Sequence, residues 1–188
     1  MAIEIRKNLT PDDVLRMIRC GDIDSDAVVE LVDGELIELA ATGFQGGKVS
    51  VRIVDALGVF SQTAGGWVLD SSTGFKVGSN HLQLRSPDAS YIAPGRAEPE
   101  DDAFIDGAPD LAVEVLSPDQ YGPAYARTKV REYFDAGARL VWLVHPKRQE
   151  VRVYRPGADE FAILKGDAVL SLEPIAAGFA LIIADIFR

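Results

Sequence analysis

The stretch GAPDLAVEVLSPD, Gly107 to Asp119, indicates the centre of the fold. With the two-residue period of a β-strand, one face carries three apolar side chains, Leu111, Val113 and Val115. The other face carries Ala112, Glu114 and Leu116. A strand that is apolar on both faces is typical of a covered sheet, where an ionised carboxylate without a partner costs on the order of several kcal/mol. Glu114 therefore needs a partner, either a metal ion or a buried cation.

The segments after this strand predict a strand-helix-strand crossover. Pro123 and Gly137 frame a helix, and RLVWLVHP (139–146) predicts a buried strand. A connection of this length joins parallel strands and should be right-handed. EVRVYRP (150–156) and EFAILKG (160–166) predict an additional hairpin.

The segments before this strand predict two helices, a hairpin and several further strands. Thr10 and Pro11 indicate a helix start, and Asp33-Gly34 is a strong hairpin signal. Residues 46–64 have helical apolar spacing. Strands are expected at GWVLDSS (66–72), TGFKVG (73–78) and HLQLRSPDASYIA (81–93), and a mobile acidic loop over the sheet edge at 95–109. The fold class is therefore α/β (α+β), with a mixed central sheet flanked by helices.

Composition bounds the class of protein. The 188 residues form most simply one domain, 1–188, and the contents of 47% hydrophobic and 26% charged residues are those of a soluble globular protein. No segment resembles a signal peptide or a membrane span, so the expected localisation is cytoplasmic, with no membrane partner. A single cysteine, Cys20, and two histidines make a zinc cluster improbable. Cys20 is expected to be a small apolar helix residue.

The charge distribution is uneven. The net charge is −10, which by itself argues against a nucleic-acid partner. Residues 1–126 carry 9 basic and 21 acidic side chains, whereas residues 127–155 carry 8 basic and 3 acidic ones. The basic segment is either a phosphate-binding surface or an ordinary solvated face.

Three charged residues form the candidate catalytic site. Asp88 follows Pro87 and leads into an apolar strand, as Glu114 interrupts one. If these strands are neighbours, the two carboxylates can share Mg²⁺, which takes one or two protein carboxylates and fills its other positions with water and phosphate. Lys129 lies on the flank of the apolar arc of its helix and can reach the sheet, whereas Arg131 points the opposite way.

Each of these residues also has a structural interpretation. An Asp after Pro is often a turn or cap residue, and Glu114 could form a buried ion pair with Lys129 or an arginine. Lys129 could be a snorkelling lysine on the flank of its helix. Trp142, Tyr133 and Phe134 are expected in the core.

The motifs PDAS, PDLAVEVLSP and AGARLVWLVHP, with Lys129 followed four residues later by a tyrosine, resemble the Uma-type restriction endonucleases of the PD-(D/E)xK nuclease superfamily. The resemblance begins at ELVDGELIEL and extends to GFALIIADIF. It implies a restriction endonuclease-like core, a homodimer, and Asp88 and Glu114 as metal-binding carboxylates. The lysine expected two residues after Glu114 is replaced by Leu116, so its role passes to Lys129.

The chain departs from the family pattern at two places. Gly47 and Lys48 stand where the family commonly has a histidine, and Tyr125 stands where it often has an acid. His145, where the family usually has Asp, is expected to be a strand-end residue. Glu30 and Glu35 match family acids, so one of them could approach the metal, although surface charge is the favoured interpretation for each.

Two functions of different class follow from these features. The first is a Mg²⁺-dependent (or Mn²⁺-dependent) endonuclease that hydrolyses DNA phosphodiester bonds, with Asp88, Glu114 and Lys129 as catalytic residues. Nucleic-acid contacts would then come from the basic segment: Arg127, Arg131, Lys147 and Arg148. The alternative is a catalytically inactive homodimeric scaffold or binding protein on the nuclease fold. An enzyme that acts on another phosphate ester is a third hypothesis.

Overall fold

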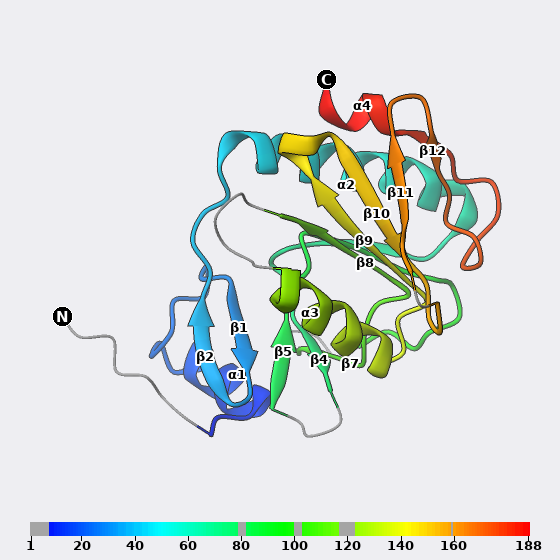
Figure 1. Ribbon diagram of the computed structural model, residues 1–188. Helices are drawn as coiled ribbons and strands as arrows, with labels where there is room; N and C mark the ends of the chain where they lie inside the picture. Colours follow the sequence, from blue (N-terminus) through cyan, green and yellow to red (C-terminus); the bar gives the residue numbers. More distant parts are fainter. Residues whose placement is uncertain (1–7, 79–81, 100–102, 117–122, 159) are drawn as a thin grey trace.

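The computed structural model describes residues 8–78, 82–99, 103–116, 123–158 and 160–188 (Figure 1). A six-stranded sheet has the order β11-β10-β9-β8-β6-β3, in which β8 and β9 are parallel and the other neighbours are antiparallel. Its strands are β3 (Trp67–Asp70), β6 (Ala89–Ile92), β8 (Leu111–Val115), β9 (Leu140–His145), β10 (Glu150–Tyr154) and β11 (Ala162–Lys165). The parallel pairing of β8 and β9 around the intervening helix, and the hairpin of β10 and β11, are confirmed.

A second sheet lies beside the first and has the order β2-β1-β5-β4-β7. Its strands are β1 (Val29–Val32), β2 (Glu35–Glu38), β4 (Phe75–Val77), β5 (Gln83–Arg85) and β7 (Ile105–Asp106). A short antiparallel pair, β12 (Val169–Leu170) with β13 (Leu181–Ile182), forms a third sheet. The expected mixed α+β architecture with additional hairpins is therefore confirmed.

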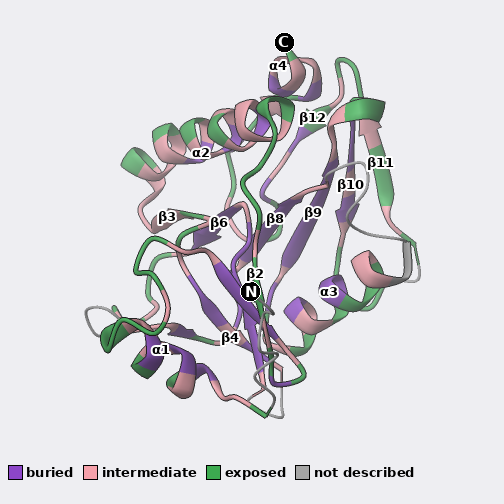
Figure 2. Ribbon diagram, turned by 90° about the vertical axis from the view of Figure 1, so that its left-hand side faces the viewer, coloured by how far each residue is buried: buried purple, intermediate pink, exposed green. Residues whose placement is uncertain are grey.

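Helices cover both faces of the six-stranded sheet. The described helices are α1 (Pro11–Arg19), α2 (Phe44–Ala64), α3 (Pro123–Asp135), the 3₁₀ helix η1 (Pro146–Arg148) and α4 (Ile183–Phe187). Helices α2 and α3 lie on the two faces of the six-stranded sheet, whereas α1 packs against the second sheet. The period-two pattern of β8 separates the two cores: Leu111 and Val113 pack with α2, whereas Ala112 packs with α3. Both strands at the centre, β8 and β9, are buried along almost their whole length (Figure 2). No described helix is long and apolar enough to cross a membrane.

Local signals give two elements as expected. Thr10 and Asp13 form a capping box at the start of α1, in which each side chain bonds the other residue's backbone N–H. Asp33 and Gly34 both have positive φ, 50° and 78°, as the two-residue turn between β1 and β2 requires. Cys20 lies at the C-cap of α1 and is exposed, so the expectation of an apolar helix position is wrong for this residue.

Two connections differ from the expectation. Within the segment 95–109, residues 105–106 form β7, because the buried Ile105 pairs with Phe75 of β4; residues 100–102 lie outside the described part of the chain. The strand expected over 81–93 is divided between the two sheets, β5 in one and β6 in the other. Pro87 lies at the division, where it has no N–H to donate to a ladder. Asp88 is thereby placed where the two sheets meet.

Candidate active site

Asp88 and Glu114 lie on neighbouring strands and point to the same face of the sheet. The antiparallel register pairs Ala89 with Val113, so one further residue brings Asp88 opposite Glu114. The backbone N–H of Val115 donates to Oδ2 of Asp88 over 2.7 Å. This bond fixes the carboxylate of Asp88 at the end of β8.

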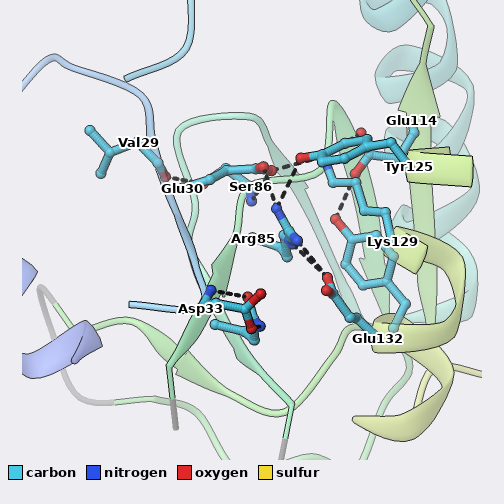
Figure 3. A network of polar contacts seen from close by, with 11 residues as sticks. Val29, Glu30, Asp33, Arg85, Ser86, Glu114, Tyr125, Lys129 and Glu132 are labelled. Atoms are coloured by element: carbon cyan, nitrogen blue, oxygen red, sulfur yellow. Dashed lines mark hydrogen bonds and ion pairs between the residues drawn. The ribbon is translucent and has the colours of Figure 1, made fainter. Parts of the chain in front are cut away.

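Lys129 is the partner that Glu114 requires. Its ammonium Nζ lies 2.8 Å from Oε2 of Glu114 and 2.8 Å from Oε1 of Glu30. The other oxygen of Glu114, Oε1, accepts a hydrogen bond of 2.6 Å from the hydroxyl of Tyr133. Because α3 covers this face of the sheet, the lysine and the tyrosine reach Glu114 from one helix, one turn apart. Figure 3 shows Lys129 between Glu114 and Glu30. Lys129 is 5% exposed and is thus a buried ion-pair partner instead of a snorkelling surface lysine.

Arg85 ties Glu30 to α3. The pairing of Leu31 with Leu84 sets Glu30 opposite Arg85, and Nη1 of Arg85 donates to Oε2 of Glu30 over 2.9 Å. The same guanidinium contacts Oε2 of Glu132 at 2.8 and 2.6 Å and donates to the hydroxyl of Tyr125 at 3.1 Å. The arginine therefore joins the second sheet to the helix that carries Lys129 (Figure 3). We call Glu30, Arg85, Glu114, Lys129 and Glu132 the central network.

The charges in this network shift one another's pKa values. Burial raises the pKa of Glu114 to about 7; the nearby carboxylates of Asp88 and Glu30 add to the rise and Lys129 opposes it. Burial also raises the pKa of Asp88. Glu30 behaves differently: burial opposes its ionised form, but the charges of Lys129 and Arg85 outweigh burial and lower its pKa. For Lys129, Glu114 and Glu30 outweigh burial and raise the pKa, so its ammonium stays charged.

A pocket of about 1050 Å³ opens over this site. Asp88, Glu114 and Lys129 line it together, and Lys48 and Lys147 add two further cations. We call it the inner pocket. It is wide enough to admit a segment of a polymeric substrate, and at its floor two carboxylates and one ammonium meet.

The donor chemistry of the inner pocket fits a hard divalent cation. Asp88 and Glu114 offer carboxylate oxygens from adjacent strands, and Mg²⁺ commonly takes one or two such ligands and completes its shell with water and phosphate. Each carboxylate oxygen has two acceptor positions, so the bonds from Val115 and Lys129 leave capacity for a metal. Among the described residues, no group of three or more acids, histidines or cysteines has the geometry of a metal site. The two carboxylates would thus be its protein ligands.

The structure brings the three predicted catalytic residues together and separates the two additional acids. Asp88, Glu114 and Lys129 all line the inner pocket. Glu30 is fully buried beneath it, bound to Lys129. Glu35 is exposed on β2 and is not a lining residue, which agrees with its interpretation as surface charge.

Of the four predicted nucleic-acid contacts, two line a pocket and two do not. Lys147 lines the inner pocket, and Arg148 lines a neighbouring smaller one. Arg127 and Arg131 are exposed on α3 and line neither pocket, and Arg131 pairs with Asp135, as its direction on the helix predicted.

The two departures from the family pattern have defined surroundings. Tyr125 accepts the hydrogen bond from Arg85, and its ring lies 5.8 Å from the guanidinium carbon. Lys48 donates to the carbonyl of Phe187 over 3.4 Å and lines the inner pocket. His145 ends β9, as expected for a strand-end residue.

Sequence reasoning missed two members of this site. Tyr133 was expected in the core, where Trp142 and Phe134 do pack, but its hydroxyl also bonds Glu114. Arg85 was not identified, although it ends the apolar run LQLR much as Glu114 interrupts LAVEVL. An arginine in a strand that is otherwise apolar was the signal that could have found it.

Comparisons with known proteins identify the family of the chain and its fold. The family model Uma2, described as "Putative restriction endonuclease", matches residues 11–184. Among solved structures, the chain is similar to a putative nuclease belonging to DUF820 from Anabaena variabilis ATCC 29413. That similarity has a TM-score of 0.78 and 22% sequence identity, and covers 95% of this chain and 97% of the other. No match was found among curated proteins.

Proposed function

The chain belongs to the Uma2 family of putative restriction endonucleases, and from this membership and the geometry of the inner pocket we propose that it is a Mg²⁺-dependent endonuclease that hydrolyses DNA phosphodiester bonds. The observation that supports the proposal most strongly is the convergence of Asp88, Glu114 and Lys129 at the floor of one pocket. Two carboxylates beside a buried ammonium are the groups that phosphodiester hydrolysis by water requires.

Each residue has a definite part in the proposed reaction. Asp88 and Glu114 would hold Mg²⁺ or Mn²⁺, which would supply Lewis-acid polarisation of the phosphate and make the attacking water more acidic. Lys129 carries a fixed positive charge at the pocket floor, where it orients the attacking water and stabilises the negative charge that develops on the phosphoryl oxygens. Glu30 and Arg85 do not line the pocket; they hold the ammonium of Lys129 in place.

A plasmid cleavage assay with Mg²⁺ or Mn²⁺ tests the proposal. We expect Asp88→Asn, Glu114→Gln and Lys129→Met each to lose about a thousandfold in rate, since each removes an interaction of several kcal/mol in the transition state. Glu35→Gln is the matched control, because it makes the same change on an exposed hairpin and should keep full activity. Metal-dependent cleavage that survives in both carboxylate variants would overturn the assignment.

One observation favours the alternative, a catalytically inactive homodimeric scaffold on the same fold. Both oxygens of Glu114 are bonded within the protein, and Lys129 is shared between two carboxylates, so Glu114 has a cationic partner without a metal. Calorimetric titration with Mn²⁺ separates the two functions. The absence of both Mn²⁺ binding and cleavage, together with a dimer in sedimentation, would support the scaffold.

A further inference from the structure

A second pocket adjoins the inner one and has a different charge. It has a volume of about 400 Å³ and is lined by residues of η1, β11 and α4. Three of its lining residues are the cations Arg148, Lys165 and Arg188, and no described lining residue is acidic. We call it the outer pocket. In a chain of net charge −10, three cations around one hollow indicate an anionic ligand.

The two pockets are adjacent and share two lining residues. Gln149 and Phe187 line both of them, so a polymer that leaves the inner pocket over these residues enters the outer one. Lys147 on the inner side and Arg148 on the outer side are consecutive residues of η1. Cations therefore follow the route from the carboxylates to the outer pocket.

A buried carboxylate, Glu150, forms ion pairs with two cations of the outer pocket. Glu150 is 3% exposed, and its oxygens lie 2.8 Å from Lys165, 3.1 Å from Arg152 and 3.8 Å from Arg148. One negative charge thus faces three positive ones, which leaves a positive surplus at the surface. Arg148 and Lys165 remain 64% and 56% exposed, so both can still reach a ligand. The remaining cation, Arg188, pairs with Asp185 at 2.7 Å and is 75% exposed.

Gln149 lines both pockets and has a left-handed backbone conformation at the C-cap of η1. Its φ and ψ are 47° and 48°, the left-handed region that a residue with a side chain adopts at a cost of about 1 to 3 kcal/mol. Its exposed side chain lies at the boundary of the two pockets and offers an amide donor to an anion.

We propose that the outer pocket binds backbone phosphates that neighbour the cleaved phosphate on the same nucleic-acid strand. This strand would pass from the inner pocket to the outer pocket over Gln149 and Phe187. This inference rests on the proposed function and extends it by giving the direction of the substrate. It selects Arg148 with Lys165 and Arg188 as phosphate contacts, and it assigns no such contact to Arg127 or Arg131.

Fluorescence anisotropy with a labelled DNA duplex, in buffer with EDTA so that no cleavage occurs, tests the inference. The double variant Lys165→Gln/Arg188→Gln is compared with Arg127→Gln/Arg131→Gln, which removes the same charge from outside both pockets. We expect the pocket variant to bind about tenfold or more weakly and to lower the slope of log K against log salt by about 2. The control should change affinity less than about threefold, since exposed charges away from the ligand are screened.

Further outcomes separate this inference from the proposed function. Equal weakening in both double variants would overturn the inference, because the effect would then be one of net charge alone. If the wild type binds and cleaves DNA but the pocket variant behaves as the control does, the inference falls and the function stands. If the wild type binds DNA without cleaving it and the pocket variant alone binds weakly, the outer pocket stands and the nuclease function falls. If the Lys165→Gln change unfolds the protein, the double variant Arg148→Gln/Arg188→Gln is used in place of Lys165→Gln/Arg188→Gln.

Discussion

Glu114 and Glu150 are both almost inaccessible carboxylates on the six-stranded sheet, yet their pKa values move in opposite directions. Burial raises the pKa of Glu114 to about 7, and Asp88 and Glu30 add to the rise. For Glu150, burial also opposes ionisation, but hydrogen bonds from Lys165 and Arg152 outweigh it and lower the pKa. The two side chains are 7% and 3% exposed, so accessible surface does not explain the difference.

The charged neighbours of each carboxylate and its depth beneath the surface together explain it. Glu114 shares a single ammonium with Glu30 and has Asp88 beside it, so acids outnumber the cations around it. Glu150 has three cations and lies just beneath a surface where Lys165 reaches solvent. A region with a deficit of positive charge is suited to recruit a metal ion, whereas a region with a surplus is suited to bind phosphate.

The largest expected effect on stability comes from replacing Arg85, a member of the central network. Arg85→Met removes the cation from Glu30 and Glu132 while keeping a long apolar stem, and it should lower the free energy of unfolding by about 3 to 5 kcal/mol, the cost of leaving a buried charge without its partner. Urea denaturation monitored by circular dichroism measures the change. Arg131→Met, whose pair with Asp135 is exposed, should change stability by less than about 0.5 kcal/mol. A loss below about 1 kcal/mol for Arg85→Met would show that the network does not depend on this arginine.

The second prediction concerns the pH dependence that Glu114 imposes. Because its pKa in the folded protein lies above the unfolded value of 4.5, the unfolded chain releases the proton first as pH rises. Stability is therefore lost between about pH 4.5 and 7, by about 3 kcal/mol in total for a shift of this size. Glu114→Gln should remove this slope in urea denaturation with EDTA present, whereas Glu38→Gln, on exposed β2, should keep it. Parallel curves for wild type and Glu114→Gln would contradict the raised pKa.

Much of the fold could be predicted because its signals are local. The alternation in Leu111–Val115, the cap at Thr10 and the turn at Asp33-Gly34 each depend on residues adjacent in sequence. Strand β7 could not be found this way, since its two residues pair with β4 some thirty positions earlier and are preceded by an acidic segment. Pairing partners at such separations leave no periodic trace.

In the site too, local sequence signals could be read, whereas contacts between distant segments could not. Asp88, Glu114 and Lys129 could be found because each is a charge in an apolar context, and helical spacing indicated that Lys129 faces the sheet. The contact between Glu30 and Arg85 depends on the register of β1 with β5, which one residue pair, Leu31 with Leu84, establishes. Sequence reasoning therefore found the carboxylates and the ammonium, and missed the arginine that binds Glu30, the second carboxylate partner of Lys129.

The smallest expected effect on stability concerns Glu150. A carboxylate with a lowered pKa contributes stability above the unfolded value of 4.5 and loses it as pH falls through the folded value. Glu150→Gln should therefore cost about 1 kcal/mol at pH 7, since Lys165 and Arg148 can turn to water, and the two proteins should become equally stable near pH 3. Glu38→Gln again serves as the exposed control. As pH rises, the stability of the wild type should increase relative to Glu150→Gln and decrease relative to Glu114→Gln, so slopes of the same sign would contradict the opposite pKa shifts of these two carboxylates.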